Sequence, residues 1–166
     1  RELVIKLSEI TGFTYAMIAS LDSSKNSAKT LAISKNGIIQ DNFNYELKGT
    51  PCYETSLKDF CIYEDDVASL FPEDIFLTEE SINSYIGILL KSSSGDAIGI
   101  LALMDNSFSK KQNTDEVLSI FSSRAASELE RLIFEKDLFI VQKRFSLHID
   151  NTPLGVIELD NNLTIL

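Results

Sequence analysis

The sequence predicts an α+β fold in which an antiparallel sheet is covered on both faces. From Ser84 to Asp105, two short apolar runs flank a polar turn that contains Gly95. Glycine supplies the positive φ that a tight connection between two strands requires. Both runs are apolar at successive positions, and a strand that is apolar on both sides is covered on both sides. Apolar spacings of three and four residues near both ends of the chain predict terminal helices. We therefore expect this hairpin at the centre of the sheet, with terminal helices on one face and a helical or irregular segment over the other.

The N-terminal third predicts one helix followed by short strands. Leu3, Leu7 and Ile10 have helical spacing, and Gly12 is typical of a helix end. Three strands are expected to follow, at residues 14–21, 28–34 and 43–47. In the second of these strands, Leu31 and Ile33 are both expected to face the core.

The middle of the chain is predicted to be helical or irregular. Thr50 can cap a helix whose first position is Pro51, because proline at that position loses no hydrogen bond. A short strand is expected at 60–63. A short helix begins at Asp65 and Asp66, ends where Pro72 interrupts the pattern, and is followed by an irregular or helical stretch at 73–82.

In the central hairpin, alternation assigns the side chains to two faces. Ile98, Ile100 and Ala102 are expected on one face of their strand, and Gly99, Leu101 and Leu103 on the other.

The last large element predicted is a helix that begins at Thr114. Its first apolar stripe recurs at three- and four-residue steps and consists of Leu118, Phe121, Ala125, Leu129 and Leu132. A second stripe on a shifted face consists of Phe134, Leu138, Val141 and Phe145. An unbroken helix would have about 30 residues and a length near 45 Å, more than a small domain needs. Its C-terminal part is therefore either a linker helix of coiled-coil type or a helix buried on both sides.

Composition and charge exclude several classes of partner. The chain has 166 residues, with 25 acidic and 15 basic side chains and a formal charge of −10. An acidic surface repels phosphate backbones and anionic lipid, so we expect neither nucleic acid nor direct membrane contact. No apolar run approaches the roughly 18 residues of a membrane span, and no signal peptide is visible. Because the chain starts at Arg1 and ends within an apolar run, we interpret it as a piece of a longer protein.

The residues with reactive side chains predict no catalytic or metal centre. Cys52 and Cys61 have neither metal-ligand spacing nor a disulfide framework, which suits a reducing compartment and a cytoplasmic location. The one histidine, His148, lies far from both cysteines in the sequence. Adjacent carboxylates, such as those of Glu79 and Glu80, point about 100° apart on a helix and do not share a site. Phosphate-loop and dinucleotide-binding glycine patterns are not found.

The order of elements and several local segments resemble GAF domains of multidomain bacterial signalling proteins. The similar segments are Lys29-Thr30-Leu31-Ala32, residues 42–52, Phe71-Pro72-Glu73-Asp74, Ser84-Tyr85-Ile86-Gly87 and Ile98-Gly99-Ile100-Leu101. The resemblance implies a GAF domain at 1–136, a linker helix at 137–147 and the truncated start of a PAS domain at 148–166. It also implies a non-catalytic sensory and relay module, upstream of an output such as a histidine kinase or a cyclic dinucleotide enzyme.

The resemblance implies a small-molecule pocket over one face of the sheet. The candidate lining residues are Tyr45, Cys52, Tyr53, Phe71, Phe76 and Tyr85. Covalent bilin is not expected, because the family's pigment cysteine is commonly followed by histidine, whereas Tyr53 follows Cys52 and Ile62 follows Cys61. The cysteine pattern of the family's methionine sulfoxide reductases and the signature of its cyclic-nucleotide-binding members are also not matched. The ligand is therefore unknown, and a redox enzyme that uses the two cysteines is the least favoured alternative.

A homodimer is expected along the last helix. If the four side chains of the second stripe stayed in water, each would lose roughly 1.5–3 kcal/mol of burial free energy. An exposed apolar strip of this kind marks an interface. The predicted interface is the two stripes together: Leu118, Phe121, Ala125, Leu129, Leu132, Phe134, Leu138, Val141 and Phe145. A ligand-free dimerisation spacer is therefore the main alternative to a ligand sensor.

Overall fold

The computed structural model describes residues 1–108 and 114–150 and confirms the α+β fold. Contacts divide the chain into two compact units, Arg1–Glu130 and Arg131–Leu166. The PAS start was predicted at 148–166. Residues 148–150 are helical, and residues 151–166 lie outside the described residues. The domain boundary at 136, which came from the resemblance alone, stays a prediction.

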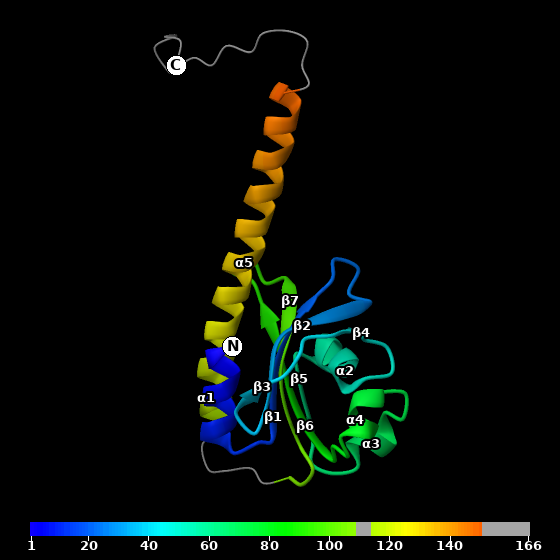
Figure 1. Cartoon of the computed structure of the whole chain (residues 1–166). Coiled ribbons are helices and arrows are strands. Elements are labelled where there is room, and N and C mark those ends of the chain that lie inside the picture. Colours follow the sequence, from blue (N-terminus) through cyan, green and yellow to red (C-terminus); the bar gives the residue numbers. More distant parts are fainter. Residues whose placement is uncertain (109–113, 151–166) are drawn as a thin grey trace. The chain divides into compact units, whose positions relative to one another are not determined.

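One antiparallel sheet of seven strands forms the middle layer of the first unit (Figure 1). The strands are β1 (Tyr15–Leu21), β2 (Ser27–Lys35), β3 (Ile38–Ile39), β4 (Asn44–Glu46), β5 (Phe60–Tyr63), β6 (Ser84–Lys91) and β7 (Ala97–Asp105). Their spatial order is β3-β2-β1-β7-β6-β5, with β4 paired to β2. The hairpin of β6 and β7 therefore lies inside the sheet, as predicted, and β7 pairs with β1 on its other side.

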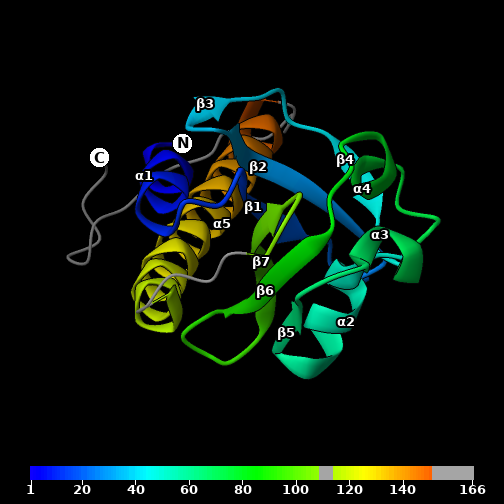
Figure 2. The ribbon, with the colours of Figure 1, turned by 90° about the horizontal axis from the view of Figure 1, so that it is seen from below.

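Helices cover both faces of this sheet (Figures 1 and 2). On one face lie α1 (Glu2–Thr11) and the part of α5 (Thr114–Asp150) that belongs to the first unit. The other face is covered by α2 (Pro51–Lys58), α3 (Val67–Leu70) and α4 (Ile75–Glu79). We call these faces the helix face and the pocket face.

The helix face carries a cluster of buried, mostly aliphatic side chains from strands and helices. Its buried members include Val4, Leu7, Ile18, Ile86, Leu90, Leu101, Leu103, Leu118, Ala125 and Leu129. Gly99 of β7 lets α5 approach closely, because a Cβ at this position would lie 2.5 Å from both Leu129 Cδ2 and the carbonyl oxygen of Ala19. Such distances are far inside van der Waals contact, so the packing requires a residue without a side chain.

Two β-bulges change the predicted side-chain alternation. The register of β6 and β7 shifts between Leu90 and Lys91, and the extra residue is Ile98, which packs on the helix face rather than beside Ile100. The register of β1 and β2 shifts between Ile18 and Ala19, so Leu31 packs on the helix face while Ile33 lies on the pocket face. The prediction for Ile98 was wrong, and Leu31 and Ile33 both face the core but on opposite faces of the sheet, because one inserted residue reverses the order of faces.

Local signals mark most element ends correctly. Gly12 ends α1 in the left-handed conformation, with φ 77°, and its N–H donates to the carbonyl of Ser8. Asn36 and Gly37 have φ 51° and 76°, which suits the hairpin turn between β2 and β3. The strand β3 itself was not predicted. The buried face of α1 differs from the predicted one by part of a helical turn, since Val4 is buried while Ile10, which was predicted to face the core, is 51% exposed.

Helix α5 has two parts that differ in burial. Leu118, Ala125 and Leu129 are buried within the first unit, whereas Leu132 is 47% exposed. The buried stripe therefore ends at Leu129. The buried three already have their apolar surface covered by their own chain, which corrects their predicted place in a dimer interface.

Candidate functional site

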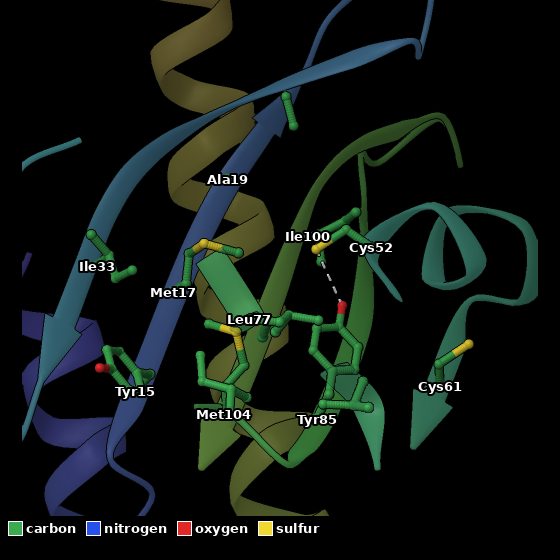
Figure 3. Close-up of a cluster of buried hydrophobic side chains, with 14 of the residues drawn as sticks. Tyr15, Met17, Ala19, Ile33, Cys52, Cys61, Leu77, Tyr85, Ile100 and Met104 are labelled. Atoms are coloured by element: carbon green, nitrogen blue, oxygen red, sulfur yellow. Dashed lines mark hydrogen bonds between the residues drawn. The ribbon is translucent and has the colours of Figure 1, made fainter. Parts of the chain in front are cut away.

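A cavity of about 510 Å³ lies between the pocket face of the sheet and the segment that carries β4, α2 and α4. Strands β1, β6 and β7 contribute Met17, Tyr85 and Met104 to its wall. In the view of Figure 3, Met17, Leu77 and Met104 lie between Tyr15 and Tyr85. Because this volume falls within the range of small-molecule sites, the cavity is the candidate functional site.

The first turn of α2 is positioned by local sequence signals. Thr50 Oγ1 accepts a hydrogen bond from the N–H of Tyr53 at 3.3 Å and donates to the carbonyl of Leu47 at 2.7 Å. Pro51 is the first helical residue, as predicted. Gly49 has φ 82°, and a Cβ there would lie 2.6 Å from Glu73 Oε2. A glycine is therefore needed where the chain enters α2 beside the α4 segment.

A buried polar cluster surrounds the thiol of Cys52. The hydroxyls of Tyr45 and Tyr85 each donate to Cys52 Sγ at 3.4 Å, and Tyr85 Oη lies 3.0 Å from Thr55 Oγ1 (Figure 3 shows the Tyr85–Cys52 bond). Gly87 makes room for this arrangement, since a Cβ there would lie 2.3 Å from both Thr55 Oγ1 and Tyr85 Oη. Sequence reasoning gave Gly87 no role, because a strand glycine signals only a close approach and not its partner.

The ionisation of this cluster is controlled by burial. Burial raises the pKa of the Cys52 thiol to about 11, and it raises the pKa values of Tyr45 and Tyr85 well above their ordinary range. Burial also raises the pKa of Cys61. All four groups are therefore protonated at neutral pH. Since the thiolate is the reactive form of cysteine, neither thiol is activated as a nucleophile.

Aromatic rings form the other side of the cavity. The ring centroids of Phe43 and Tyr45 are 5.7 Å apart, and those of Phe43 and Phe76 are 5.4 Å apart. Phe76 also contacts Tyr15 edge-on at 5.5 Å. Phe43 was not among the predicted lining residues, although it directly precedes β4 in a segment that carries the GAF resemblance. The signal that could have found it is its proximity in sequence to Tyr45.

The two ends of α4 carry carboxylates in opposite surroundings. At the N-terminus, Asp74 Oδ1 accepts from the N–H of Leu77 at 3.3 Å, and burial raises the pKa of Asp74. At the C-terminus, Glu80 Oε2 accepts from Lys35 Nζ at 2.6 Å and from the hydroxyl of Tyr15. Those two hydrogen bonds lower the pKa of Glu80. Of the two carboxylates, only Asp74 lines the cavity.

The structure brings together four of the six predicted pocket residues: Tyr45, Cys52, Phe76 and Tyr85. The other two were misplaced. Tyr53 is 38% exposed on the outer side of α2, and Phe71 packs edge-on against Tyr63 at 5.3 Å. Sequence position identified the right segment, but the direction of each side chain depends on how its short helix docks.

The part of the chain that the structure describes offers no metal centre. There, no three histidine, cysteine or carboxylate side chains gather as metal ligands would. Among the same residues, no helix combines the length and the apolar character needed to cross a membrane. The side chain of His148 lies outside the described residues.

Comparison with known proteins shows the fold. No family model and no curated protein matches the sequence. Among solved structures, the GAF domain of an Acinetobacter phosphoenolpyruvate-protein phosphotransferase aligns with 81% of this chain and 82% of its own, at 9% identity and a TM-score of 0.62. Residues 122 to 287 of a methyl-accepting chemotaxis protein align with 80% of this chain and 85% of theirs, at 21% identity and a TM-score of 0.60.

A third similar structure is the free methionine-R-sulfoxide reductase of Neisseria meningitidis with its substrate. It aligns over 76% of this chain and 74% of its own, at 17% identity and a TM-score of 0.58. The chain spans about half the length, 51%, of the chromophore-binding domain of a Stigmatella aurantiaca phytochrome. At these identities the likeness concerns the fold alone, and the chain therefore has the fold of GAF domains.

Proposed function

We propose that the first unit is a non-catalytic sensory module of a cytoplasmic signalling protein and that it binds a small molecule in the cavity on its pocket face. The observation that carries this proposal is the contrast in packing within one sheet. The helix face carries a continuous cluster of buried apolar side chains, while the pocket face borders a cavity of about 510 Å³ lined by methionine, aromatic, polar and charged side chains. Small-molecule sites have this mixture of apolar surface and a few orienting polar groups.

The comparisons agree with a sensory role. Proteins of this fold include a segment of a chemotaxis protein and the chromophore-binding domain of a phytochrome. A reductase also has this fold, but the elevated pKa values of Cys52 and Cys61 make thiol chemistry in this chain unfavourable. We therefore favour a sensory function over that of a redox enzyme.

Mass spectrometry tests the sensor. The denatured protein is analysed for small molecules that co-purify, and the same compounds are added back in thermal melts. Met104→Phe, which extends a ring into the cavity, is expected to abolish the ligand-induced rise in melting temperature. If no compound co-purifies and none from a metabolite library stabilises the wild type more than Met104→Phe, the module is not a sensor of this kind.

The second part of the proposal is a homodimer formed through the C-terminal half of α5. Phe134, Leu138, Val141 and Phe145 recur at steps of four, three and four residues and are all exposed within the second unit. This is the a/d spacing of a two-helix coiled coil, and an identical helix around a two-fold axis is the simplest partner. Because α5 is one helix in both units, a ligand that favours one packing of its first part would bias the dimer.

Analytical ultracentrifugation tests the dimer. Leu138→Glu combined with Val141→Glu is expected to shift the protein toward monomer while circular dichroism and the melting temperature of the first unit stay unchanged. A matched control is Lys136→Glu with Lys143→Glu, which alters exposed charges outside the stripe. A wild type that is monomeric at high concentration contradicts the relay, and a dimer without any ligand favours the spacer.

A further inference from the structure

We infer that the cavity selects a cationic ligand, such as an organic amine with an apolar body, and that Asp74 is the carboxylate that recognises its charge. This inference rests on the proposed function, since it names the chemical class of the ligand of that same cavity. It is carried by three features of the wall: its charges, its aromatic rings and the surroundings of Asp74.

The charged groups at the cavity are mostly acidic. Four carboxylates line it and one ammonium group, that of Lys48, opposes them. The carboxylates are those of Glu46, Glu73, Asp74 and Glu79. Three of the four, and Lys48, are exposed, while Asp74 is partly buried. Negative potential at a low-dielectric concave surface attracts cations and repels anions. A phosphate- or carboxylate-bearing ligand is therefore disfavoured.

Asp74 lacks a cationic partner within residues 1–108 and 114–147. Its carboxylate accepts backbone N–H bonds from Leu77 and Phe76, and no lysine or arginine of the described residues pairs with it. The contrast with Glu80, which receives Lys35 at the other end of α4, shows that the fold supplies a cation to one carboxylate and not to the other. A partly buried, unpaired carboxylate is stabilised by any cation that reaches it.

Aromatic rings line the same cavity as Asp74. Phe76 of α4 lies two residues after Asp74, the residue that caps this helix, and its ring contacts Phe43, which in turn contacts Tyr45. Burial raises the pKa values of both Tyr45 and the Cys52 thiol, and the negative charge of Asp74 contributes to each increase, which places the carboxylate near both groups. Ring faces attract ammonium groups, and an amine between these rings and the carboxylate would gain from both interactions.

A matched set of three probes tests the charge preference. We would titrate 2-phenylethylamine, 2-phenylethanol and phenylacetate, which share a phenyl ring and a short arm but are cationic, neutral and anionic at pH 7. Dissociation constants are measured by NMR chemical-shift titration of wild-type protein. The expected order of affinity is amine, then alcohol, then carboxylate, with the amine at least about fivefold tighter than the alcohol.

Asp74→Asn tests the residue assigned to this preference. Asparagine caps a helix as well as aspartate does, so α4 is expected to stay folded. The variant should lose at least about fivefold in amine affinity and keep its alcohol affinity within about twofold. Glu64→Gln, an exposed charge that does not line the cavity, is the matched control and should leave all three affinities unchanged.

The outcomes separate this inference from the proposed function. Alcohol or carboxylate binding as tightly as the amine would overturn the charge preference while leaving a ligand-binding cavity in place. Equal loss of amine affinity in Asp74→Asn and Glu64→Gln would overturn the role of Asp74. Failure of the wild type to bind the amine at a concentration of about 20 mM, far above the range of specific small-molecule affinities, would overturn it as well. A cationic compound among the co-purifying molecules would support the inference, and an anionic one would contradict it.

Discussion

The two faces of the sheet belong to the same strands, yet their apolar side chains are packed differently. On the helix face, side chains of α1 and α5 pack in one buried cluster with those of the strands, and α5 approaches the sheet closely at Gly99. On the pocket face, the segment that carries β4, α2 and α4 borders a cavity lined by methionine, aromatic, thiol, hydroxyl and carboxylate side chains. The two faces are therefore expected to respond differently when side-chain atoms are deleted or added.

The largest expected effect compares one leucine on each face. Leu101 on the helix face and Leu77 at the cavity are both 1% exposed. Leu101→Ala is expected to lower the free energy of unfolding by about 3–5 kcal/mol, because it creates a void in filled packing. Leu77→Ala should cost about 2–3 kcal/mol, since Leu77 lines the cavity and the space left by its deleted atoms can join that cavity. Urea denaturation of both variants measures this, and equal losses would mean that the cavity is filled in solution.

The next comparison adds atoms instead of removing them. Gly99→Ala places one methyl group against the backbone of β1 and the side chain of Leu129, and is expected to cost about 1–3 kcal/mol. Met104→Phe adds a larger group on the pocket face, where the cavity can take it, and should cost less than about 1 kcal/mol. Thermal melts of the two variants give the ranking. A larger loss for Met104→Phe would place the free space elsewhere.

A smaller effect concerns the two carboxylates of α4 and their dependence on pH. The hydrogen bonds from Lys35 and Tyr15 lower the pKa of Glu80. The charged carboxylate therefore stabilises the fold above the pKa of Glu80 in the unfolded chain, about 4.5. This stabilisation is lost as pH falls through the lower pKa of Glu80 in the folded protein. Glu80→Gln should cost about 1 kcal/mol at pH 7, since the pair is partly exposed. Below about pH 5, the stability of Glu80→Gln should also change less with pH than that of the wild type.

Asp74 is expected to behave in the opposite way. Because burial raises its folded pKa, the charged form is disfavoured, and stability is lost as pH rises from 3.8 through the folded value. Without ligand, Asp74→Asn should therefore be as stable as the wild type at pH 7, or more so. Urea melts at pH 4, 5 and 7 compare the two variants, and a loss of more than about 1 kcal/mol for Asp74→Asn would show that its charge is already compensated.

The smallest expected effect is the reference for the other three. Asp96 lies in the exposed turn between β6 and β7, where its carboxylate accepts a hydrogen bond from the hydroxyl of Ser94. Asp96→Ala should change the free energy of unfolding by less than about 0.5 kcal/mol. A larger change in the same urea assay would mean that the turn, rather than packing on the two faces, sets the stability of the hairpin.

Sequence alone identified the pocket segment but only part of its lining. Tyr45, Cys52, Phe76 and Tyr85 were found because the resemblance to GAF domains implied a pocket over one face of the sheet, next to the part of the chain that carries them. Met17 and Met104 were not, because they have the pattern of ordinary core positions of strands. The glycines at 49 and 87 gave a signal of special backbone or close approach, but the signal named no partner.

What the sequence determined by itself is local: helix ends at Gly12 and Thr50, the turns at Gly37 and Gly95, and the two-sided apolar hairpin. These follow from dihedral preferences, capping and side-chain alternation, which act over a few residues. Only the tertiary structure decided on which face of the sheet the side chains at each bulge lie, and where the buried stripe of α5 ends. It also decided that Asp74 lines a cavity while Glu80 pairs with Lys35. Those outcomes depend on contacts between residues far apart in the chain, whose distances no local pattern contains.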